Sequence, residues 1–389
     1  MASGRAAEGS LSLGVFASSR KENELRLPLH PRHLPRISAD LQRRVFLEGG
    51  YGERFGIPDE ELKAHVAGFR TRDQLVAECD VILNPKPVLD DIERLRPGQV
   101  FWGWPHCVQD EELTQVAIDK GLTVIAFEAM HHWNRDGSFN LHVFHSNNEL
   151  AGYASVLHAM QLTGATGHYG PLLRGVVIGF GATARGAVLA LNSLGVRDVD
   201  VLTHREVSAV ASPIHTAGLF HFDRGTGTGR ATHVATGDGL VPVASFLAEH
   251  DVVVNCVLQD TDAPEMFMTD DDLPAMKPGS LIVDVSCDEG MGFSWARPTS
   301  FNAPVFVVGD NVTYYAVDHS PSHLWTSSTW VNSEALLPFV GPVLDGGDAW
   351  DAHPTIRRAI EIREGVIQNP AILTFQGRSP QHPHYPLAT

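Results

Sequence analysis

Short apolar runs recur along the first third of the chain, with amphipathic stretches between them. The runs cover residues 11–16, 43–47, 81–83, 100–104 and 123–127. Runs this short and continuous are typical of parallel strands that are buried on both faces. Apolar residues at helical spacing fill residues 59–69, 89–95 and 111–120. The pattern therefore predicts an open α/β sheet.

A second alternating region follows a long stretch of helical spacing at residues 147–162. Residues 207–238, which are rich in Gly, Thr and Ala, are interpreted as a loop with one irregular strand. The order of the remaining elements predicts a second doubly wound sheet. Its strands are expected at residues 175–180, 198–202, 252–257 and 281–285, and its helices at residues 183–194 and 240–249.

A glycine-rich turn follows the first strand of this second sheet. Small residues stand where a backbone must approach a pyrophosphate or a helix must lie close to a strand, namely Gly179, Gly181, Ala184 and Gly186. The amides of the turn and of the following helix would face the phosphates. Because the motif follows a predicted strand and opens a predicted helix, it indicates a dinucleotide-binding site.

The next predicted strand ends in Thr203, His204 and Arg205 rather than in an acidic residue. Enzymes that use NAD usually place an acid there for the ribose hydroxyls, whereas a cation suits the 2'-phosphate of NADPH. We therefore predict NADPH as the cofactor, with NADH as the alternative. In that alternative, Glu206 takes the acidic role or Arg205 points to solvent.

The chain is longer than one core comfortably allows, since domains usually hold roughly 100 to 200 residues. Helical spacing at residues 325–339 and 355–366 indicates that the chain returns to the first domain. We predict a substrate (catalytic) domain of residues 1–146 and 320–389 around a dinucleotide-binding domain of residues 147–319. The fold class is α/β, with two Rossmann-like doubly wound domains and an inter-domain cleft. Residues 376–389 lack apolar periodicity and predict a loosely held terminus.

Composition narrows the class of partner. The net charge of -17 argues against nucleic acid and against an anionic membrane, and favours small molecules. Residues 1–9 lack a secretory pattern, and no run approaches the roughly 20 apolar residues that span a bilayer, so we expect a cytoplasmic protein. The four cysteines show no paired spacing and are interpreted as buried thiols in a reducing compartment.

Histidines gather at His131, His132, His142 and His145, but they lack the HxxxH or HExxH spacing of a metal site. We therefore predict no metal, and expect these side chains to be exposed or hydrogen-bonded.

Polar residues follow the apolar strands of the first region, where loops gather at the carboxyl edge of a parallel sheet. A guanidinium at Arg26 would hold a substrate carboxylate by two parallel hydrogen bonds; the alternative is a surface ion pair with Glu22 or Glu24. Lys86, between two prolines, and His106, just past a strand, are candidates for proton transfer.

In the second region, Asp288 follows a strand and is expected near the nicotinamide, whereas Asp318 and His319 begin the return to the first domain. The alternatives are that Asp288 caps a helix and that Asp318 forms a turn with Pro321.

Several sparse motifs in one order make the chain resemble the superfamily of alanine dehydrogenase and lysine-forming saccharopine dehydrogenase, and most closely its N-delta-(carboxyethyl)ornithine synthases. The similarity covers nearly the whole chain. It is carried by the glycine turn and by residues 20–31, 46–52, 103–106, 151–157 and 282–288.

The resemblance implies a reductive amination, in which a 2-oxo acid condenses with an amine and the imine takes a hydride from the nicotinamide. By position it makes Arg26 the carboxylate-binding arginine, Lys86 and His106 the active-site lysine and histidine, and Asp288 the aspartate near the nicotinamide. Asp318 and His319 would contact the substrate.

The chain also departs from alanine dehydrogenases. It has His319-Ser-Pro321 and Trp325 where they have Asn-Met-Pro and a following arginine, and its cofactor strand lacks their acid. The run from Asp318 to Ser322 instead resembles that of saccharopine dehydrogenases, which favours a product built from two substrates.

We therefore predict an NADPH-dependent oxidoreductase that joins a small 2-oxo acid, such as pyruvate or glyoxylate, to an amino-acid amine of the ornithine or lysine type. One alternative is a simple amino-acid dehydrogenase of the alanine type that releases ammonia. The other is a non-catalytic nucleotide-binding sensor. Relatives are commonly oligomeric, which leaves a homo-oligomer open.

Overall fold

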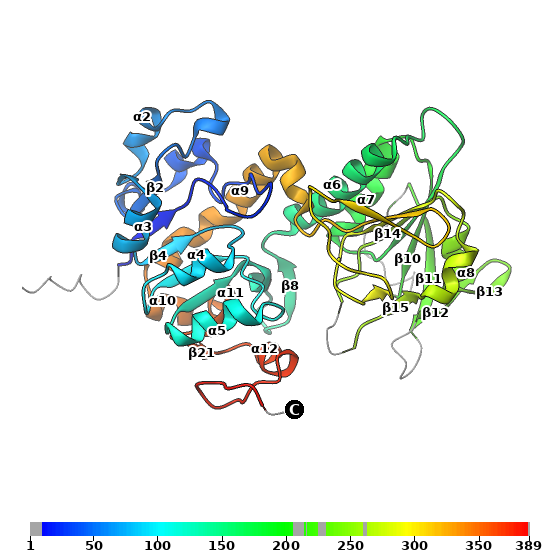
Figure 1. Ribbon diagram of the computed structural model, residues 1–389. Helices are drawn as coiled ribbons and strands as arrows, with labels where there is room; N and C mark the ends of the chain where they lie inside the picture. Colours follow the sequence, from blue (N-terminus) through cyan, green and yellow to red (C-terminus); the bar gives the residue numbers. More distant parts are fainter. Residues whose placement is uncertain (1–9, 205–213, 215, 225–230, 260–262, 388–389) are drawn as a thin grey trace, which may run out of the picture. The chain divides into compact units, whose positions relative to one another are not determined.

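The computed structural model describes residues 10–204, 214, 216–224, 231–259 and 263–387 (Figure 1). The chain divides into two compact units. The first, here called the catalytic unit, comprises Met1–His145 and Trp325–Thr389, and the second, the nucleotide unit, comprises Ser146–Leu324. Each unit is built around one large sheet.

The catalytic unit has an eight-stranded sheet of order β21-β20-β6-β5-β4-β1-β2-β3, in which β1 to β6 run parallel and β20 is antiparallel to β6. Its strands are β1 (Leu13–Val15), β2 (Val45–Glu48), β3 (Gly68–Arg70), β4 (Val81–Leu83), β5 (Val100–Gly103), β6 (Thr123–Ala126), β20 (Ile360–Arg363) and β21 (Val366–Ile367), with a separate hairpin of β7 (His131–Trp133) and β8 (Phe139–His142).

Helices cover both faces of this sheet, because each buried strand alternates its side chains between two cores. Val81 and Leu83 face a core that includes α9, whereas Ile82 between them faces a core that includes α3, α4 and α5. The helices are α1 (Ala39–Gln42), α2 (Asp59–Leu62), α3 (Arg72–Glu78), α4 (Leu89–Glu93), α5 (Glu111–Asp119), α9 (Trp325–Leu344), α10 (Gly347–Ala352), α11 (Pro354–Ala359) and α12 (Pro370–Phe375), with short 3-10 helices η1 (Pro31–Arg36), η2 (Glu53–Phe55), η3 (Lys63–His65) and η4 (Phe127–Ala129).

The nucleotide unit has a nine-stranded sheet of order β13-β12-β11-β10-β9-β14-β16-β19-β18. Its six central strands, β11 to β19 in that order, are parallel; at the edges β12 pairs antiparallel with β11, β13 with β12, and β18 with β19. The elements are α6 (His145–Thr163), β9 (Arg174–Ile178), α7 (Ala182–Ser193), β10 (Asp198–Thr203), β11 (Gly218–Arg224), β12 (Ala231–Thr236), β13 (Gly239–Pro242), α8 (Val243–Ala248), β14 (Val252–Asn255), β15 (Met266–Met268), η6 (Asp270–Ala275), β16 (Leu281–Asp284), β17 (Gly292–Phe293), β18 (Val305–Val308), β19 (Val312–Tyr315) and η7 (Ser320–Leu324).

The predicted elements match most buried strands and the long helix α6, but four segments were wrong. The helix predicted at residues 59–69 ends in short turns, and Gly68–Arg70 pairs with β2 as β3. The helix predicted at residues 355–366 ends at Ala359, because the next residues pair with β6. The segment at residues 207–238 holds two strands, β11 and β12, and the helix predicted from residue 240 begins only at Val243, after β13. In each case, pairing with a neighbouring strand decides the structure, and the local sequence pattern does not show that pairing.

The terminus predicted to be loose is anchored in its described part. Arg378 and His384 are buried, at 5% and 1% exposure. The Arg378 guanidinium donates to Gln115 at 2.7 Å, and the Ile367 amide donates to His384 Nε2 at 3.1 Å. These contacts attach the C-terminal segment to α5 and β21 of the catalytic unit.

Candidate active site

Three of the predicted residues follow adjacent strands of the catalytic unit. The strand order β5-β4-β1 places the segments with His106, Lys86 and Arg26 side by side, and the strands are parallel, so all three leave the same carboxyl edge. Two contacts join the segments: Ser19 Oγ donates to the Lys86 carbonyl at 2.5 Å, and the Trp104 amide donates to the Pro85 carbonyl at 2.9 Å.

Lys86 and His106 form a direct pair, with Lys86 Nζ 2.7 Å from His106 Nε2. Lys86 is buried, whereas the His106 side chain is 44% exposed. His106 has a φ of 51°, a left-handed conformation that non-glycine residues rarely adopt and that is found at functional sites. The pair therefore places an amine and an imidazole, one buried and one accessible, within a single proton transfer of each other.

Arg26 is held by a buried carboxylate. Its Nε and Nη2 donate to the two oxygens of Glu24 at 2.8 and 2.5 Å, and both residues are almost fully buried. The guanidinium also lies over the Trp104 ring, 5.1 Å from its centroid. Glu24, one of the two ion-pair partners considered above, binds Arg26, and this pair is internal rather than on the surface.

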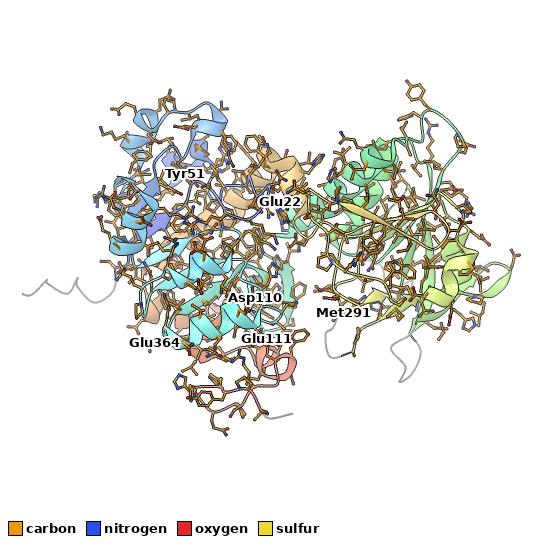
Figure 2. All side chains as sticks on the ribbon, viewed as in Figure 1. Glu22, Tyr51, Asp110, Glu111, Met291 and Glu364 are labelled. Carbon is orange, nitrogen blue, oxygen red and sulfur yellow. The ribbon has the colours of Figure 1, made fainter. Side chains whose placement is uncertain are left out.

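The loop that carries Arg26 is fastened at its far end by Tyr51, which Figure 2 labels near the top of the catalytic unit. The buried hydroxyl of Tyr51 donates to the Leu29 carbonyl at 2.7 Å and accepts from the Leu29 amide at 3.2 Å. A buried hydroxyl with both bonds made resists displacement, so Arg26 lies on a rigid segment.

Glu128, which the sequence reasoning missed, lies directly behind His106. It belongs to η4 after β6, the next strand in the sheet order. Glu128 Oε1 accepts the His106 amide at 2.8 Å and lies 3.9 Å from His106 Nδ1. Burial raises the pKa of Glu128, and the charge of the neighbouring Glu361 raises it further. The rule that singled out Lys86 and His106, a polar residue just past a buried strand, would also have found Glu128.

In the nucleotide unit, two glycines of the turn have features that a side chain would disturb: Gly179 through its backbone conformation and Gly181 through the open space beside it. Gly179 has a φ of 113°, which only glycine adopts readily. Gly181 precedes the first residue of α7, and a Cβ there would meet no atom within 4 Å. The turn therefore offers an open backbone at a helix N-terminus, as a pyrophosphate requires.

The other two small residues of the motif serve packing. Ala184 is fully buried on α7. A Cβ at Gly186 would lie 1.8 Å from the Glu149 carbonyl, and one at Gly152 would lie 1.9 Å from the Thr183 carbonyl. Gly152 and Gly186 thus let α6 and α7 cross with their backbones in contact, which sets the direction of the helix that begins at the turn.

The end of β10 is described only in part. Thr203 is buried as the last residue of the strand, and His204 is exposed, with its carbonyl 3.1 Å from His221 Nε2. Arg205, on which the NADPH prediction depends, lies outside the described residues.

A buried network supports the loop that holds Asp288. Asp284, at the end of β16, accepts from Tyr314 OH at 2.5 Å, from Asn255 Nδ2 at 3.0 Å and from the Cys287 amide at 3.2 Å. Burial raises the pKa of Asp284 and of Asp288 to about 6 each. No helix begins at Asp288, so the capping alternative does not apply.

Asp318 and His319 form a close pair, with Asp318 Oδ1 2.5 Å from His319 Nδ1. His319 is buried with its ring against the edge of Phe301, whereas Asp318 keeps 26% of its side chain exposed. Of the two, Asp318 is the residue that presents charge outward, and His319 orients it.

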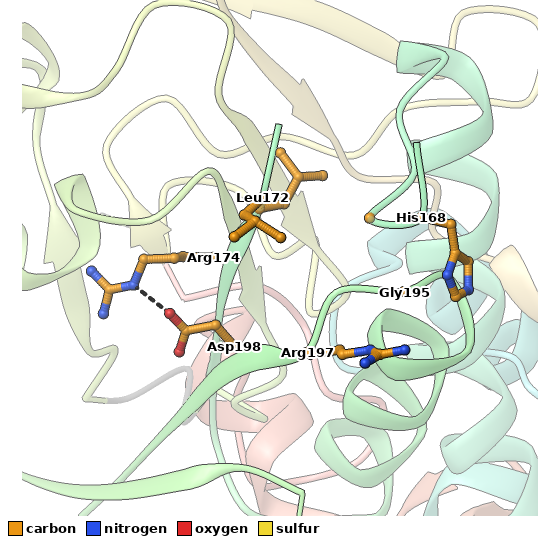
Figure 3. Close-up of a pocket in the computed structure, with 8 residues that line it drawn as sticks. His168, Leu172, Arg174, Gly195, Arg197 and Asp198 are labelled. Carbon is orange, nitrogen blue, oxygen red and sulfur yellow. Dashed lines mark hydrogen bonds and ion pairs between the residues drawn. The ribbon is translucent and has the colours of Figure 1, made fainter. Parts of the chain in front are cut away.

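A separate hollow lies at the opposite edge of the nucleotide sheet, where β9 and β10 begin (Figure 3). It has a volume of about 360 Å³ and includes Arg174, whose Nε donates to Asp198 at 3.0 Å. The hollow lies at the amino ends of β9 and β10, whereas the glycine turn follows the carboxyl end of β9, and Arg174 is engaged by Asp198 and Asp200. It carries no part of the dinucleotide site.

Two further observations concern metal ions and membranes. Within the described ranges, His, Cys, Asp and Glu side chains nowhere gather in a set of three or more suited to a metal ion. Across the same ranges, no helix combines the length and the apolar character that a membrane crossing requires.

These observations define a class: an α/β protein of two units, with a Rossmann-type glycine turn in one unit and a contacting lysine–histidine pair in the other. The chain belongs to the alanine dehydrogenase/PNT family, whose N-terminal domain matches residues 14–151 and whose C-terminal domain matches residues 155–370. The superfamily resemblance seen in the sequence is thereby confirmed, as is an NAD(P)-dependent oxidoreductase that acts on CH–NH donors.

Individual relatives agree with this membership. Alanine dehydrogenase of Mycobacterium tuberculosis (strain ATCC 25618 / H37Rv) is 28% identical over 379 residues, which cover 92% of this chain and 95% of that protein. An N(5)-(carboxyethyl)ornithine synthase of Clostridium botulinum is 23% identical, with coverage of 84% and 92%. A solved L-alanine dehydrogenase superposes with a TM-score of 0.72 at 20% identity, covering 94% of this chain and 99% of that one, which confirms the α/β fold.

Proposed function

We propose that this protein uses NADPH to condense a small 2-oxo acid, such as pyruvate or glyoxylate, with the amine of an amino acid of the ornithine or lysine type. The amine attacks the oxo carbon, water leaves to give an imine, and reduction of the imine yields a secondary amine. The observation that carries the proposal is the 2.7 Å contact between Lys86 Nζ and His106 Nε2 at the carboxyl edge of the catalytic sheet.

The reaction needs a proton removed from the attacking nitrogen and a proton delivered to the departing oxygen. A lysine and a histidine in contact can hold one proton between them and exchange it in either direction. Lys86 is buried and fixed between two prolines, so it would act on the oxo carbon, and the more exposed His106 would exchange the proton with solvent. The nicotinamide, when bound, supplies the hydride.

Arg26 would bind the carboxylate of the 2-oxo acid. Its guanidinium is preorganised by Glu24 and by the Trp104 ring, so little conformational freedom is lost when a carboxylate binds. Glu24 also offsets the charge of an otherwise isolated buried cation. In the nucleotide unit, Asp288 would lie near the nicotinamide, and Asp318, oriented by His319, would attract the cationic amine.

A second candidate is an alanine-type dehydrogenase, in which ammonia replaces the amino acid. It is favoured by the names of the relatives, since the alanine dehydrogenase is more identical to this chain than the ornithine synthase is. Mixing the protein with NADPH, pyruvate or glyoxylate, and either ammonia, ornithine or lysine separates the two. Cofactor oxidation with ornithine or lysine, and a secondary amine in the mass spectrum, support the condensation; oxidation with ammonia alone supports the second candidate.

The preference for NADPH rests on Arg205 in the sequence. The variant Arg205→Asp should lower kcat/KM with NADPH about tenfold or more and leave the NADH rate equal or higher, because a carboxylate repels the 2'-phosphate and binds ribose hydroxyls. An unchanged ratio of the two kcat/KM values would assign the preference elsewhere and revive NADH as the cofactor.

A further inference from the structure

A groove with a volume of about 500 Å³ lies at the carboxyl ends of β2 and β3 in the catalytic unit, beside the start of α3 (Figure 1). In the sheet order β2 is next to β1, and β1 is next to β4, so the groove shares its edge of the sheet with the segments that carry Arg26 and Lys86. Ligands of parallel α/β sheets bind along this edge. The polar side chains of the lining are Glu48, Arg70, Thr71, Arg72 and Gln74.

Hydrogen bonds join the groove to the segment that contacts Lys86. Glu48 Oε2 accepts the Ala17 amide at 2.8 Å. Two residues further along the chain, Ser19 Oγ donates to the Lys86 carbonyl at 2.5 Å. The wall of the groove and the Lys86 segment are therefore attached to the same short stretch, residues 17–19.

The charges around the groove are balanced. Arg70 Nε donates to Glu78 at 2.9 Å, and Arg72 lies between Glu48 and Asp91, at 3.6 and 3.2 Å. Each guanidinium thus has a carboxylate beside it, which leaves little net positive charge to attract a simple anion. Opposite charges side by side instead suit a zwitterion, whose carboxylate and ammonium are joined through one carbon atom.

The groove also offers hydrogen-bonding atoms of both kinds. Arg70 Nη1 donates to the Phe69 carbonyl, Gln74 Oε1 accepts the Thr71 amide, and Glu48 uses Oε2 as described above. Within the ranges that the structure describes, these bonds leave Arg70 Nη2, Gln74 Nε2 and Glu48 Oε1 without a protein partner. The two nitrogens are donors that a carboxylate can accept from, and the oxygen is an acceptor for an ammonium group.

We propose that this groove binds the amino-acid end of the amine substrate, with the α-carboxylate on Arg70 and Gln74 and the α-ammonium on Glu48. The identity of that substrate rests on the proposed function. Neighbouring strands lie about 4.8 Å apart, so the end of β2 is roughly 10 Å from the end of β4, which precedes Lys86. An amino acid with a second amine at the end of a long side chain spans a distance of this order. Ammonia makes none of these contacts.

The test measures the binding of three ligands to the full-length protein without cofactor, by isothermal titration calorimetry. They are ornithine, putrescine, which lacks the carboxylate of ornithine, and δ-aminovalerate, which lacks its α-ammonium. The wild type should bind ornithine about tenfold or more tightly than either of the others, because each of them leaves charged groups of the groove without a partner.

Two variants divide the groove by charge. Arg70→Gln should weaken ornithine and δ-aminovalerate about tenfold and leave putrescine unchanged, because putrescine has no carboxylate. Glu48→Gln, which retains an oxygen for the Ala17 amide, should weaken ornithine and putrescine by a similar factor and leave δ-aminovalerate unchanged. Arg43→Gln is the matched control, since it also removes an exposed arginine with a carboxylate partner at 2.8 Å, and it should bind all three ligands as the wild type does.

The proposal is overturned if either variant weakens all three ligands equally or weakens none of them. If Arg70→Gln does not fold, Gln74→Glu replaces it. This variant retains the oxygen that accepts the Thr71 amide, puts an anion where the donor was, and should weaken the same two ligands.

Failure of the proposed function gives a different result. Selective binding in the predicted pattern, without NADPH oxidation when a 2-oxo acid is added, would contradict the condensation and leave an amino-acid site in the groove. Turnover of ornithine with a KM that Arg70→Gln and Glu48→Gln leave unchanged would contradict the groove and leave the condensation.

Discussion

The two units build their candidate sites by opposite means. In the catalytic unit each candidate side chain is bonded to another: Lys86 to His106, and Arg26 to Glu24. In the nucleotide unit the glycine turn depends on side chains that are missing, at Gly179 and Gly181. The difference shows that the site in the catalytic unit depends on the charges of its side chains, whereas the site in the nucleotide unit depends on the space that its glycines leave open. Substitutions that change one property and spare the other separate the two.

The largest effect is expected for the loss of charge at Lys86. Lys86→Ala should lower kcat/KM about a thousandfold, because one of the two proton-transfer groups is lost, and should leave cofactor affinity unchanged. Steady-state kinetics and cofactor titration measure both. Lys63→Ala, which removes an exposed lysine of the same unit, is the control and should retain full activity. Full turnover in Lys86→Ala would show that Lys86 is not a proton-transfer group, whereas normal cofactor binding without turnover in the wild type would favour a nucleotide sensor.

In the nucleotide unit, the corresponding test adds side-chain volume at the glycine turn through the variant Gly181→Val. Its φ of -82° and ψ of -168° suit a β-branched residue, and a Cβ there meets no protein atom, so folding should be unaffected. The added methyl groups would occupy the space where the pyrophosphate must approach, and cofactor Kd should rise about a hundredfold. Thermal unfolding and fluorescence titration of NADPH give the two readouts. A normal Kd would show that the phosphates bind elsewhere.

Gly186→Ala should give the reverse result at a neighbouring position. Its Cβ would lie 1.8 Å from the Glu149 carbonyl, so α6 and α7 must separate, and the unfolding free energy should fall by about 2 kcal/mol. Urea denaturation of the wild type, Gly186→Ala and Gly181→Val makes the comparison direct. Equal stability of all three would contradict the assignment of Gly186 to helix packing.

The smallest effect is a pH dependence of stability that originates in the catalytic unit. Burial, with the charge of His131, lowers the pKa of His142 to about 4 in the folded protein, whereas an unfolded histidine titrates near 6.5. Between these values the unfolded chain binds more protons, so His142 destabilises the fold as pH falls from about 6.5 to about 4. His142→Gln should therefore lose less stability over this interval than the wild type, and the exposed His233→Gln should match the wild type. Denaturation at several pH values tests this, and parallel curves would refute it.

The sequence alone was sufficient to predict the strands and helices that bury apolar runs, and to predict where residues just past a strand would lie. Lys86, His106 and Arg26 meet at one edge because parallel strands end together, which the pattern alone predicts. It could not reveal β20, because residues 355–366 have a helical pattern and the strand exists only through pairing with β6. Nor could it show that Gly186 contacts a helix rather than a phosphate, since both uses require the same missing side chain.

The pairing of β20 with β6 also has a consequence for biosynthesis. β6 leaves the ribosome before the nucleotide unit is made, whereas β20 is made only after the whole nucleotide unit. Until then the nascent catalytic unit exposes the backbone donors and acceptors of an apolar edge strand, the type of surface that recruits other chains. The edge of β6 therefore stays exposed until β20 has been made and has paired with it. A chain whose synthesis stalls before residue 360 is prone to aggregation.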